Sequence, residues 1–319
     1  MTPTISIVIP TFDRGDVLLD TVRALFTLRD RADEVLIVDQ TPEPAAPVAE
    51  QLRSWDKAGA IRWVRLDRPS IPHAMNIGLQ WANSEVVLFL DDDIVPGPRL
   101  VAAHRAALAA SQSAWGVVGQ VLQPGEEPHE HRGYQPSAGL KADLDFPFWS
   151  TDSASVSNVM AGNLSVRREQ ALEAGGFDEN FSGSAYRFET EFCRRLLAAG
   201  GEVRFEPAAS LRHLRVQRGG TRTVGSHLTS ASPRHGMGDY YFALQSGLSL
   251  ESAAYMLRRP FREVCTRFHL RRPWYIPVKL VGEVRAFRAA VAAFRSGPQL
   301  LGHSASVTSG RLAAVNGVQ

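Results

Sequence analysis

The sequence has few cysteines and lacks long apolar segments. Its 319 residues include two cysteines, Cys193 and Cys265, and no Cys-x-x-Cys pair. This usage argues against a disulfide framework and a structural zinc site, and it favours a reducing compartment. We expect no membrane-spanning helix, because no run of about 18 uncharged apolar residues occurs. The N-terminus enters a predicted strand at once, without the basic and apolar regions of a signal peptide, so we expect a cytoplasmic protein.

The glycine-rich loops that commonly hold phosphates are also missing. No Gly-x-Gly-x-x-Gly follows a predicted strand, and there is no Gly-Lys-Ser/Thr loop. A nicotinamide cofactor and P-loop ATP hydrolysis are therefore both disfavoured. If the ligand is a nucleotide, a metal and side chains must hold its phosphates instead.

Charge is distributed unevenly along the chain. Residues 1–255 contain 24 Lys/Arg and 31 Asp/Glu, a net charge of −7, whereas residues 256–319 contain 11 Lys/Arg and 2 Asp/Glu, a net charge of +9. This asymmetry predicts that the C-terminal part presents a separate functional surface.

The first 90 residues alternate between strand and helix patterns. Short apolar, β-branched runs predict strands at 5–10, 34–39, 61–66 and 85–90, and helical spacing predicts helices at 16–29, 48–58 and 72–83. Such alternation indicates an α/β fold with a parallel sheet covered on both faces.

The second half is less regular. We predict an irregular region at 120–160, a late strand at 202–205, a mobile loop at 217–238 and helices at 163–174, 188–199, 239–256 and 275–294.

Polar residues follow three of the predicted strands. They are Thr11 and Asp13, then Asp39, then the triplet Asp91 to Asp93. In parallel sheets ligands bind beyond the carboxyl ends of the strands, so these side chains are candidates for one site.

The acidic triplet carries the strongest signal. It follows the buried strand 85–90, where adjacent like charges are costly unless a cation neutralises them. A hard divalent metal with bound phosphate oxygens would do so. The alternative is an acidic loop or helix cap before Pro96.

The other candidates are each ambiguous alone. Asp39 can accept hydrogen bonds from a ribose or a base, or it can form a turn, and the same choice holds for Thr11, Asp13 and Arg14. Glu189 and Glu191 lie two apart on a predicted helix, so they face different directions; we expect different roles unless both are simply solvated.

His213 follows the late strand in Leu211-Arg212-His213-Leu214. It is either structural or a metal ligand, and an imidazole suits manganese better than magnesium.

Together these motifs resemble glycosyltransferase family 2, whose members have the GT-A fold. The resemblance spans roughly residues 4–215 and rests on motifs that occur in order: Ile7 to Arg14, Val38-Asp39, Ala74 to Gly78, Phe89 to Asp93, Gly162 to Arg168 with Gly175 to Asp178, and Phe188 to Phe192. It implies a Rossmann-like, mostly parallel central sheet flanked by helices, with a helical C-terminal extension.

The resemblance also implies roles for particular residues. Glu189 would be the catalytic base, and Mn²⁺ or Mg²⁺ would be the cofactor. The donor would contact Pro10, Thr11, Asp13, Arg14, Asp39, Asn76, Asp91 and Asp92; the metal ligands would be Asp91, Asp93 and His213; Gly162, Asn163 and Glu191 would lie on the acceptor side. The chain departs from the family pattern at Met75, where arginine is usual, and at Phe188-Glu189, where Glu-Asp is usual.

The implied activity is transfer of a sugar from a nucleoside-diphosphate sugar to an acceptor hydroxyl with inversion. The acceptor would be a saccharide or a lipid-linked molecule, as in synthesis of a bacterial cell-surface polysaccharide or glycolipid. A nucleotidyltransferase and a non-catalytic nucleotide-sugar-binding protein are the alternatives. We expect a catalytic domain at 1–240, a basic helical extension at 241–300 and a flexible tail at 301–319.

The segment 257–295 combines ten arginine and lysine residues with six aromatic residues. Amphipathic, basic and aromatic stretches suit an anionic membrane surface, which would place the protein at the inner face of the cell membrane. The alternatives are packing on the acidic catalytic domain and, less favoured, nucleic-acid binding; we expect no nucleic-acid partner.

Overall fold

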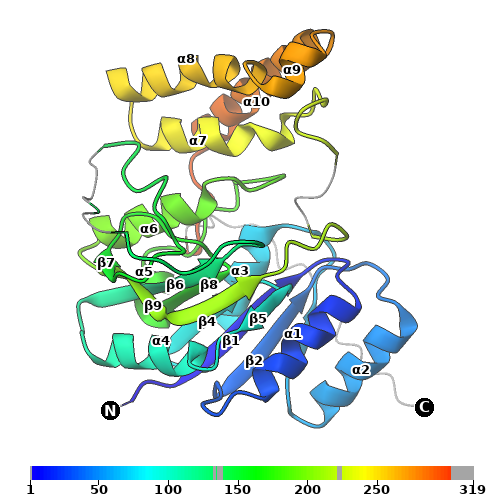
Figure 1. Ribbon diagram of the computed structural model, residues 1–319, viewed down its shortest axis with the longest axis vertical. Coiled ribbons are helices and arrows are strands. Elements are labelled where there is room, and N and C mark those ends of the chain that lie inside the picture. The colour runs from blue at the N-terminus through cyan, green and yellow to red at the C-terminus, as the bar shows by residue number, and fades with distance from the viewer. Residues whose placement is uncertain (1, 132–133, 135–138, 221–224, 303–319) are drawn as a thin grey trace.

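The computed structural model describes residues 2–131, 134, 139–220 and 225–302. Within these ranges a nine-stranded sheet is flanked by helices, and a layer of C-terminal helices lies beyond one edge of the sheet (Figure 1). The strands are β1 (Ile5–Thr11), β2 (Glu34–Asp39), β3 (Arg62–Arg65), β4 (Val86–Leu90), β5 (Ile94–Pro96), β6 (Ala114–Leu122), β7 (Ala154–Ser155), β8 (Asn163–Arg167) and β9 (Glu202–His213).

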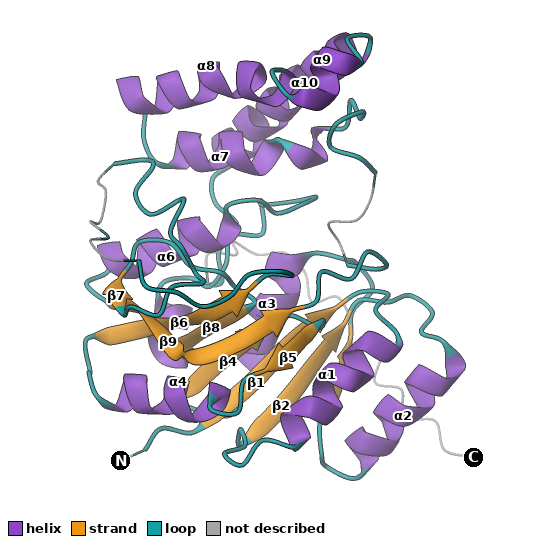
Figure 2. Ribbon diagram, viewed as in Figure 1, coloured by secondary structure: helices purple, strands orange, loops and turns teal. Residues whose placement is uncertain are grey.

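Helices connect the strands and then form the C-terminal layer (Figure 2). They are α1 (Asp16–Phe26), α2 (Ala46–Lys57), α3 (Ile71–Trp81), α4 (Leu100–Ala109), α5 (Arg168–Glu173), α6 (Phe188–Ala198), the 3₁₀ turn η1 (Pro233–His235), α7 (Met237–Gln245), α8 (Leu250–Val264), α9 (Arg267–Arg271) and α10 (Tyr275–Ser296). None of the helices in the described ranges is long and apolar enough to cross a membrane.

The strand order is β3-β2-β1-β4-β8-β6-β9-β5, and β7 also pairs with β9. The first four strands are mutually parallel, because a helix returns the chain between each of them. Thr11 lies beside Asp39 in the β1–β2 register, so the carboxyl ends of these strands meet at one edge. This arrangement confirms the predicted α/β architecture.

The second half of the sheet is mixed. β8 pairs antiparallel with both β4 and β6, and β6 pairs parallel with β9. The helix predicted at 163–174 is wrong in its first part, because 163–167 form β8 and only Arg168–Glu173 is helical. The apolar positions of β8 are buried between two partner strands, which periodicity alone could not reveal.

The core of the sheet is apolar and closely packed. Val8, Leu36 and Leu88 are fully buried. Helix α3 approaches β1 at Gly78, where an added Cβ would lie 2.2 Å from a methyl group of Val8. The glycine therefore permits the close contact between helix and strand that anchors α3.

The C-terminal helices differ from the prediction in detail. The helix expected at 239–256 is two helices, because α7 ends at Gln245 and α8 begins after the cap Ser249. The expected boundary at 240 lies inside α7. Of the tail predicted at 301–319, Leu301 is held by a 2.7 Å hydrogen bond from its N–H to the carbonyl of Gly175, and residues 303–319 lie outside the described residues.

Candidate active site

A cavity of about 250 Å³ opens at the carboxyl ends of β1 and β4. It brings together residues from distant parts of the sequence. Its lining includes the predicted site residues Pro10, Thr11, Arg14, Asp91, Asp92, Asp93, Gly162, Glu189 and His213.

Asp92 points into the protein and is held by β1 and its following loop. Its carboxylate accepts a 2.7 Å hydrogen bond from the hydroxyl of Thr11 and forms a 3.0 Å ion pair with Nε of Arg14. Burial and the neighbouring carboxylates raise the pKa of Asp92 to about 7, although Arg14 and Thr11 oppose the shift. Asp92 thus anchors the triplet to β1 and the loop that follows it.

Asp93 is buried and contacts the loop after β9. One oxygen lies 3.1 Å from Nε2 of His213, and the other accepts a 2.9 Å hydrogen bond from the N–H of Val216. Burial opposes ionisation of Asp93, but the hydrogen bond and charge of His213 outweigh it and lower the pKa of Asp93. The carboxylates in turn raise the pKa of His213 against the effect of its burial.

Asp91 faces the cavity, and its side chain is 53% exposed. Its carboxylate lies against Gly162, where an added Cβ would come within 2.1 Å of an Asp91 oxygen. The glycine therefore leaves room for this carboxylate.

Asp91, Asp93 and His213 form a candidate metal centre. Each offers one ligand atom, and these atoms all lie within 4.8 Å of one another. Two carboxylates and one imidazole suit a divalent cation such as Mn²⁺. Nδ1 of His213 lies 3.0 Å from the side-chain oxygen of Gln123, which orients the ring and leaves Nε2 directed at the acidic residues.

Asp13 and Asp39 flank this cavity without lining it. Asp39 is buried, and its carboxylate accepts hydrogen bonds from the N–H of Thr41 at 2.8 Å and the indole of Trp63 at 3.1 Å. Asp13 has φ of 51°, and its N–H donates to the Thr41 hydroxyl. The neighbouring Gln40 does line the cavity.

The predicted site residues Asn76 and Asn163 are buried and bonded to the protein. Asn76 exchanges two 2.8 Å hydrogen bonds with the backbone of Phe177 and donates to Glu179. Asn163 donates to two backbone carbonyls and lies 2.8 Å from Nε2 of His104. Both asparagines therefore organise the backbone around the cavity.

The two glutamates of α6 are separated as their spacing predicts. Glu189 lines the cavity, whereas Glu191 is buried and forms an ion pair with Arg195 at 2.5 Å. Burial raises the pKa of Glu191 despite this pairing. Met75 and Phe188, where the sequence departs from the family pattern, form apolar walls of the cavity.

The residue before helix α6 has a left-handed backbone conformation, and its side chain contacts the C-terminal layer. Arg187 caps α6 with φ of 74°, and its Nε lies 3.5 Å from Asp239 of α7. Its guanidinium also stacks 4.4 Å from the ring centre of Tyr186. The first turn of α6, which carries Glu189, is thus tied to α7.

The prediction missed Gln40, Gln123 and His104. Each acts through a partner far away in the sequence; Gln123 contacts His213, and Gln40 accepts a hydrogen bond from the N–H of Ser70. The position of Gln40 directly after Asp39 was the one available local signal.

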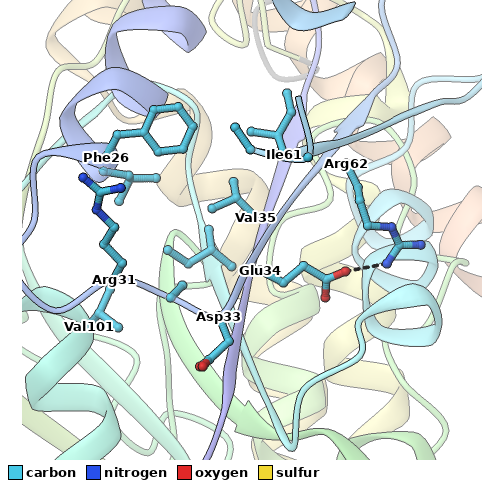
Figure 3. A pocket seen from close by; sticks show the side chains of 13 residues that line it. Phe26, Arg31, Asp33, Glu34, Val35, Ile61, Arg62 and Val101 are labelled. Atoms are coloured by element: carbon cyan, nitrogen blue, oxygen red, sulfur yellow. Dashed lines mark hydrogen bonds and ion pairs between the residues drawn. The ribbon is translucent and has the colours of Figure 1, made fainter. Parts of the chain in front are cut away.

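A larger cavity of about 410 Å³ lies near the start of β2, away from the acidic triplet (Figure 3). Three of its charged side chains, those of Asp33, Glu34 and Arg62, have protein partners. Glu34 pairs with Arg62 at 2.5 Å, and Asp33 accepts hydrogen bonds from the N–H of Ile5 and from Arg105. No predicted site residue lines this cavity, and its two carboxylates are already paired within the protein, so the smaller cavity is the candidate active site.

A known protein family matches the first half of the chain. The profile of Glycosyl transferase family 2 matches residues 6–169, which include β1 to β4 and the acidic triplet. A search of curated protein sequences gave no match.

Solved structures with similar folds include three proteins of low sequence identity. GalNAc-T7 with UDP, GalNAc and Mn²⁺ is 17% identical with a TM-score of 0.57, over 84% of this chain and 56% of that protein. The mannosyltransferase PcManGT from Pyrobaculum calidifontis, in complex with GDP-Man and Mn²⁺, is 16% identical with a TM-score of 0.54, over 92% and 76% of the two chains. TarS 1-349 of S. aureus is 12% identical with a TM-score of 0.57, over 90% and 82%. At these identities the likeness shows the shared GT-A fold alone, and the chain spans little more than half the length of GalNAc-T7.

Proposed function

Because the chain belongs to glycosyl transferase family 2, we propose that it transfers a hexosyl group from a nucleoside-diphosphate sugar to an acceptor hydroxyl with inversion. One observation carries the proposal. The candidate metal ligands Asp91, Asp93 and His213 border the same cavity as the carboxylate of Glu189.

On the donor side, the loop after β1 and the acidic triplet would hold the nucleoside diphosphate. Thr11 and Arg14 already fix Asp92, and Pro10 lines the same wall. Asp39 and Asp13 would contact the nucleoside from the flank; each Asp39 oxygen keeps a second lone pair for a ribose or base donor. Asn76 would act by holding the backbone at Phe177.

Asp91, Asp93 and His213 would hold a divalent metal, Mn²⁺ or Mg²⁺, in a DXD-type arrangement. The mannosyltransferase and GalNAc-T7 structures, which contain Mn²⁺, support this choice. When bound, such an ion stabilises the negative charge that develops on a leaving diphosphate. The side chain of Arg14, 3.5 Å from Asp93, adds fixed positive charge beside the same carboxylates.

Glu189 would act as the base. As the acceptor oxygen forms a bond to the anomeric carbon, the bond from that carbon to the diphosphate oxygen breaks, and the acceptor proton passes to the Glu189 carboxylate. Attack from the face opposite the leaving group inverts the anomeric centre. Glu191 is less suited, because Arg195 holds it away from the cavity. Gly162 and Asn163 would shape the acceptor side.

We further propose that residues 1–240 form the catalytic domain and that 241–300 form a basic helical extension. The acceptor would be a saccharide or lipid-linked molecule of a bacterial cell-surface polysaccharide or glycolipid. The basic composition of the extension supports a lipid-linked acceptor.

The donor site can be tested without knowing the acceptor. We expect UDP, GDP or dTDP to raise the melting temperature only when Mn²⁺ is present. The side chain of Asp91 is half exposed, so the variant Asp91→Asn should fold normally. It should weaken Mn²⁺-dependent nucleotide binding by about tenfold or more. Equal binding with and without Mn²⁺ would refute the metal site.

The base can be tested by nucleoside-diphosphate release from a panel of UDP- and GDP-sugars with saccharide acceptors. Glu189→Gln should lower transfer by about 10² to 10⁴-fold while leaving nucleotide binding intact. The matched control is Glu173→Gln, which removes an exposed carboxylate outside the cavity. Near-normal transfer by folded Glu189→Gln would exclude this base, and nucleotide binding without any turnover would favour a non-catalytic binder.

A further inference from the structure

The C-terminal helices have an unusual distribution of apolar and charged side chains. A helix on the surface of a water-soluble protein normally turns its apolar stripe toward the core and its charges toward water. Helix α8 instead buries a polar face and exposes an apolar stripe, and α10 buries an ion pair while several of its apolar side chains are exposed.

In α8 the buried face is polar. Ser252, Tyr255 and Arg259 follow helical spacing and pack inward, where Tyr255 and Arg259 both bind the buried carboxylate of Asp239 in α7. Arg259 is only 3% exposed. The inner side of α8 is therefore committed to hydrogen bonds and ion pairs.

The opposite face of α8 is apolar and exposed. Leu250, Leu257 and Phe261 recur at i, i+7 and i+11, on the side of the helix opposite Tyr255 and Arg259. Leu257 is 71% exposed and Phe261 is 70% exposed. These large side chains form a continuous stripe rather than scattered surface residues.

Helix α10 shows part of the same pattern. Its buried face contains Lys279 and Glu283, which pair with each other at 3.2 Å. Its exposed face contains Val281 and Val284 together with Arg285, Arg288 and Arg295, and its buried face also contains Ala286 and Ala290. Helix α10 therefore shares the buried ion pair and the exposed apolar residues of α8, and each buried charge is offset by a partner.

The short helix α9 connects these two helices and adds to the exposed apolar surface. Leu270 and Trp274 are each about two-thirds exposed or more. In Figure 1, α8 and α9 lie at the end of the molecule farthest from the first strands. We call the exposed side chains of Leu250, Leu257, Phe261, Leu270, Trp274, Val281 and Val284 the apolar rim.

The charges beside the apolar rim identify its partner. Among the described residues 250–302 one carboxylate is exposed, that of Glu251, which accepts a hydrogen bond from the N–H of Leu140. Eight arginines are exposed: Arg258, Arg262, Arg267, Arg271, Arg272, Arg285, Arg288 and Arg295. A second copy of this chain docked through the same face would bring these cations against one another. An anionic bilayer offers both a matching charge and an apolar phase.

We propose that the apolar rim inserts into the surface of an anionic lipid bilayer while the flanking arginines bind lipid phosphates. Burial of exposed Leu and Phe side chains supplies the non-polar part of binding. The buried ion pairs hold α8 and α10 in this orientation before the protein binds a membrane. This inference concerns docking and does not depend on the sugar-transfer reaction.

Flotation of the full chain with vesicles tests the proposal. We expect flotation with vesicles of phosphatidylcholine and phosphatidylglycerol, and much less with phosphatidylcholine alone. Leu257→Ser with Phe261→Ser should reduce partitioning by about tenfold or more, because both residues are exposed and their loss should not disturb folding. The control Trp81→Ser removes an exposed aromatic residue of α3 and should float like the wild type.

The contribution of the arginines to vesicle binding can be tested with two matched triple variants. Changing Arg258, Arg267 and Arg271 to Gln should weaken binding to anionic vesicles by about fivefold for each residue. The same change at Arg29, Arg53 and Arg99, which are exposed on the catalytic half, should have little effect. High salt should weaken wild-type binding and change the triple variant less.

Three outcomes would overturn the proposal. They are equal flotation of wild type and the Leu257/Phe261 variant, a stable dimer in sedimentation velocity that this variant abolishes without any flotation, and binding to nucleic acid but not to vesicles. The Mn²⁺-dependent thermal shift with nucleotide is measured on the same variants. We expect the Leu257/Phe261 variant to lose flotation but to keep the thermal shift with nucleotide. If the thermal shift is absent while flotation is normal, that result counts against the proposed activity alone.

Discussion

The sheet and the C-terminal helices solve the problem of burial in opposite ways. In the sheet, Val8 and Leu36 are buried, and charged residues such as Asp91 lie at the edge. In α8 and α10, Arg259 and Lys279 are buried while Leu257 is exposed. The sheet therefore buries apolar side chains, whereas α8 and α10 bury ion pairs and expose part of their apolar side chains.

The difference also separates two sources of stability. Apolar burial in the sheet is directly favourable, at about 25 cal/mol per Å². A buried ion-pair network costs desolvation that its contacts only offset, so its value lies in fixing one arrangement of the helices. Substitutions in the two regions should consequently fail for different reasons.

The largest effect is expected at the centre of the network. Asp239 is fully buried and pairs with Arg259 and with Arg262 at 3.0 Å. Asp239→Asn would remove the buried carboxylate that both guanidinium groups share, leaving Arg259 with Glu283 at 3.0 Å and Arg262 with Glu263 at 3.7 Å. It should lower the free energy of unfolding by about 3–5 kcal/mol. Chemical denaturation measures the change.

The control is Asp20→Asn, which removes a carboxylate that is 73% exposed and pairs with Arg23 in α1. It should leave the denaturation midpoint unchanged. Equal effects of the two substitutions would mean that the network is hydrated, and the contrast between the regions would disappear.

In the sheet, the corresponding change is Leu36→Ala. The side chain is fully buried in β2, so its removal leaves a cavity and should cost about 2–5 kcal/mol. Leu36→Met keeps the volume and should cost less than about 1.5 kcal/mol. If both substitutions cost the same, close packing would not be what stabilises this region.

The response to acid should also distinguish the regions. Burial lowers the pKa of His104 to about 4, so the folded sheet favours the neutral ring, which bonds Ser165 and Asn163. Below pH 6.5 the unfolded chain gains a proton that the folded chain does not. Stability should therefore fall by about 3 kcal/mol as the pH drops from 6.5 to about 4, with no further loss from this group below that.

The C-terminal network should respond at lower pH. Burial opposes ionisation of Asp239, but Arg259 outweighs it and lowers its pKa below 3.8. Its stabilising contribution is complete above pH 3.8 and is lost as the pH falls through the folded value. The effect of His104 can be measured separately by denaturation at several pH values. Between pH 6.5 and 4, the free energy of unfolding should depend less steeply on pH in His104→Gln than in the wild type. Parallel slopes would show that His104 is not the group responsible.

The sequence predicts the sheet better than it predicts the arrangement of the C-terminal helices. The α/β fold, the family and the convergence of residues 11, 39 and 91–93 were predicted correctly, because parallel strands share a carboxyl edge and local patterns mark where each strand ends. The residue roles at the site stay predictions. Strand β8 was missed, since its pairing with β4 and β6 depends on contacts distant in sequence.

The orientation of the C-terminal helices was also beyond the sequence. Composition at 257–295 indicates basic amphipathic helices, but either face could turn inward. Only the partners of Arg259 and Lys279, on α7, α8 and α10, decide which one does. A buried asparagine such as Asn76 poses the same difficulty, because its partner Phe177 lies 101 residues away.

The smallest effect is expected on the apolar rim itself. Leu257→Ala removes as much side chain as Leu36→Ala, yet at 71% exposure it leaves no cavity and should change the free energy of unfolding by no more than about 0.5 kcal/mol in buffer. Anionic vesicles should raise the thermal midpoint of the wild type more than that of the variant, because only bound protein gains from the buried leucine. A cost above about 1 kcal/mol in buffer that grows with protein concentration would instead place Leu257 in a contact between copies of the chain, and the inversion of α8 would then serve assembly rather than a membrane.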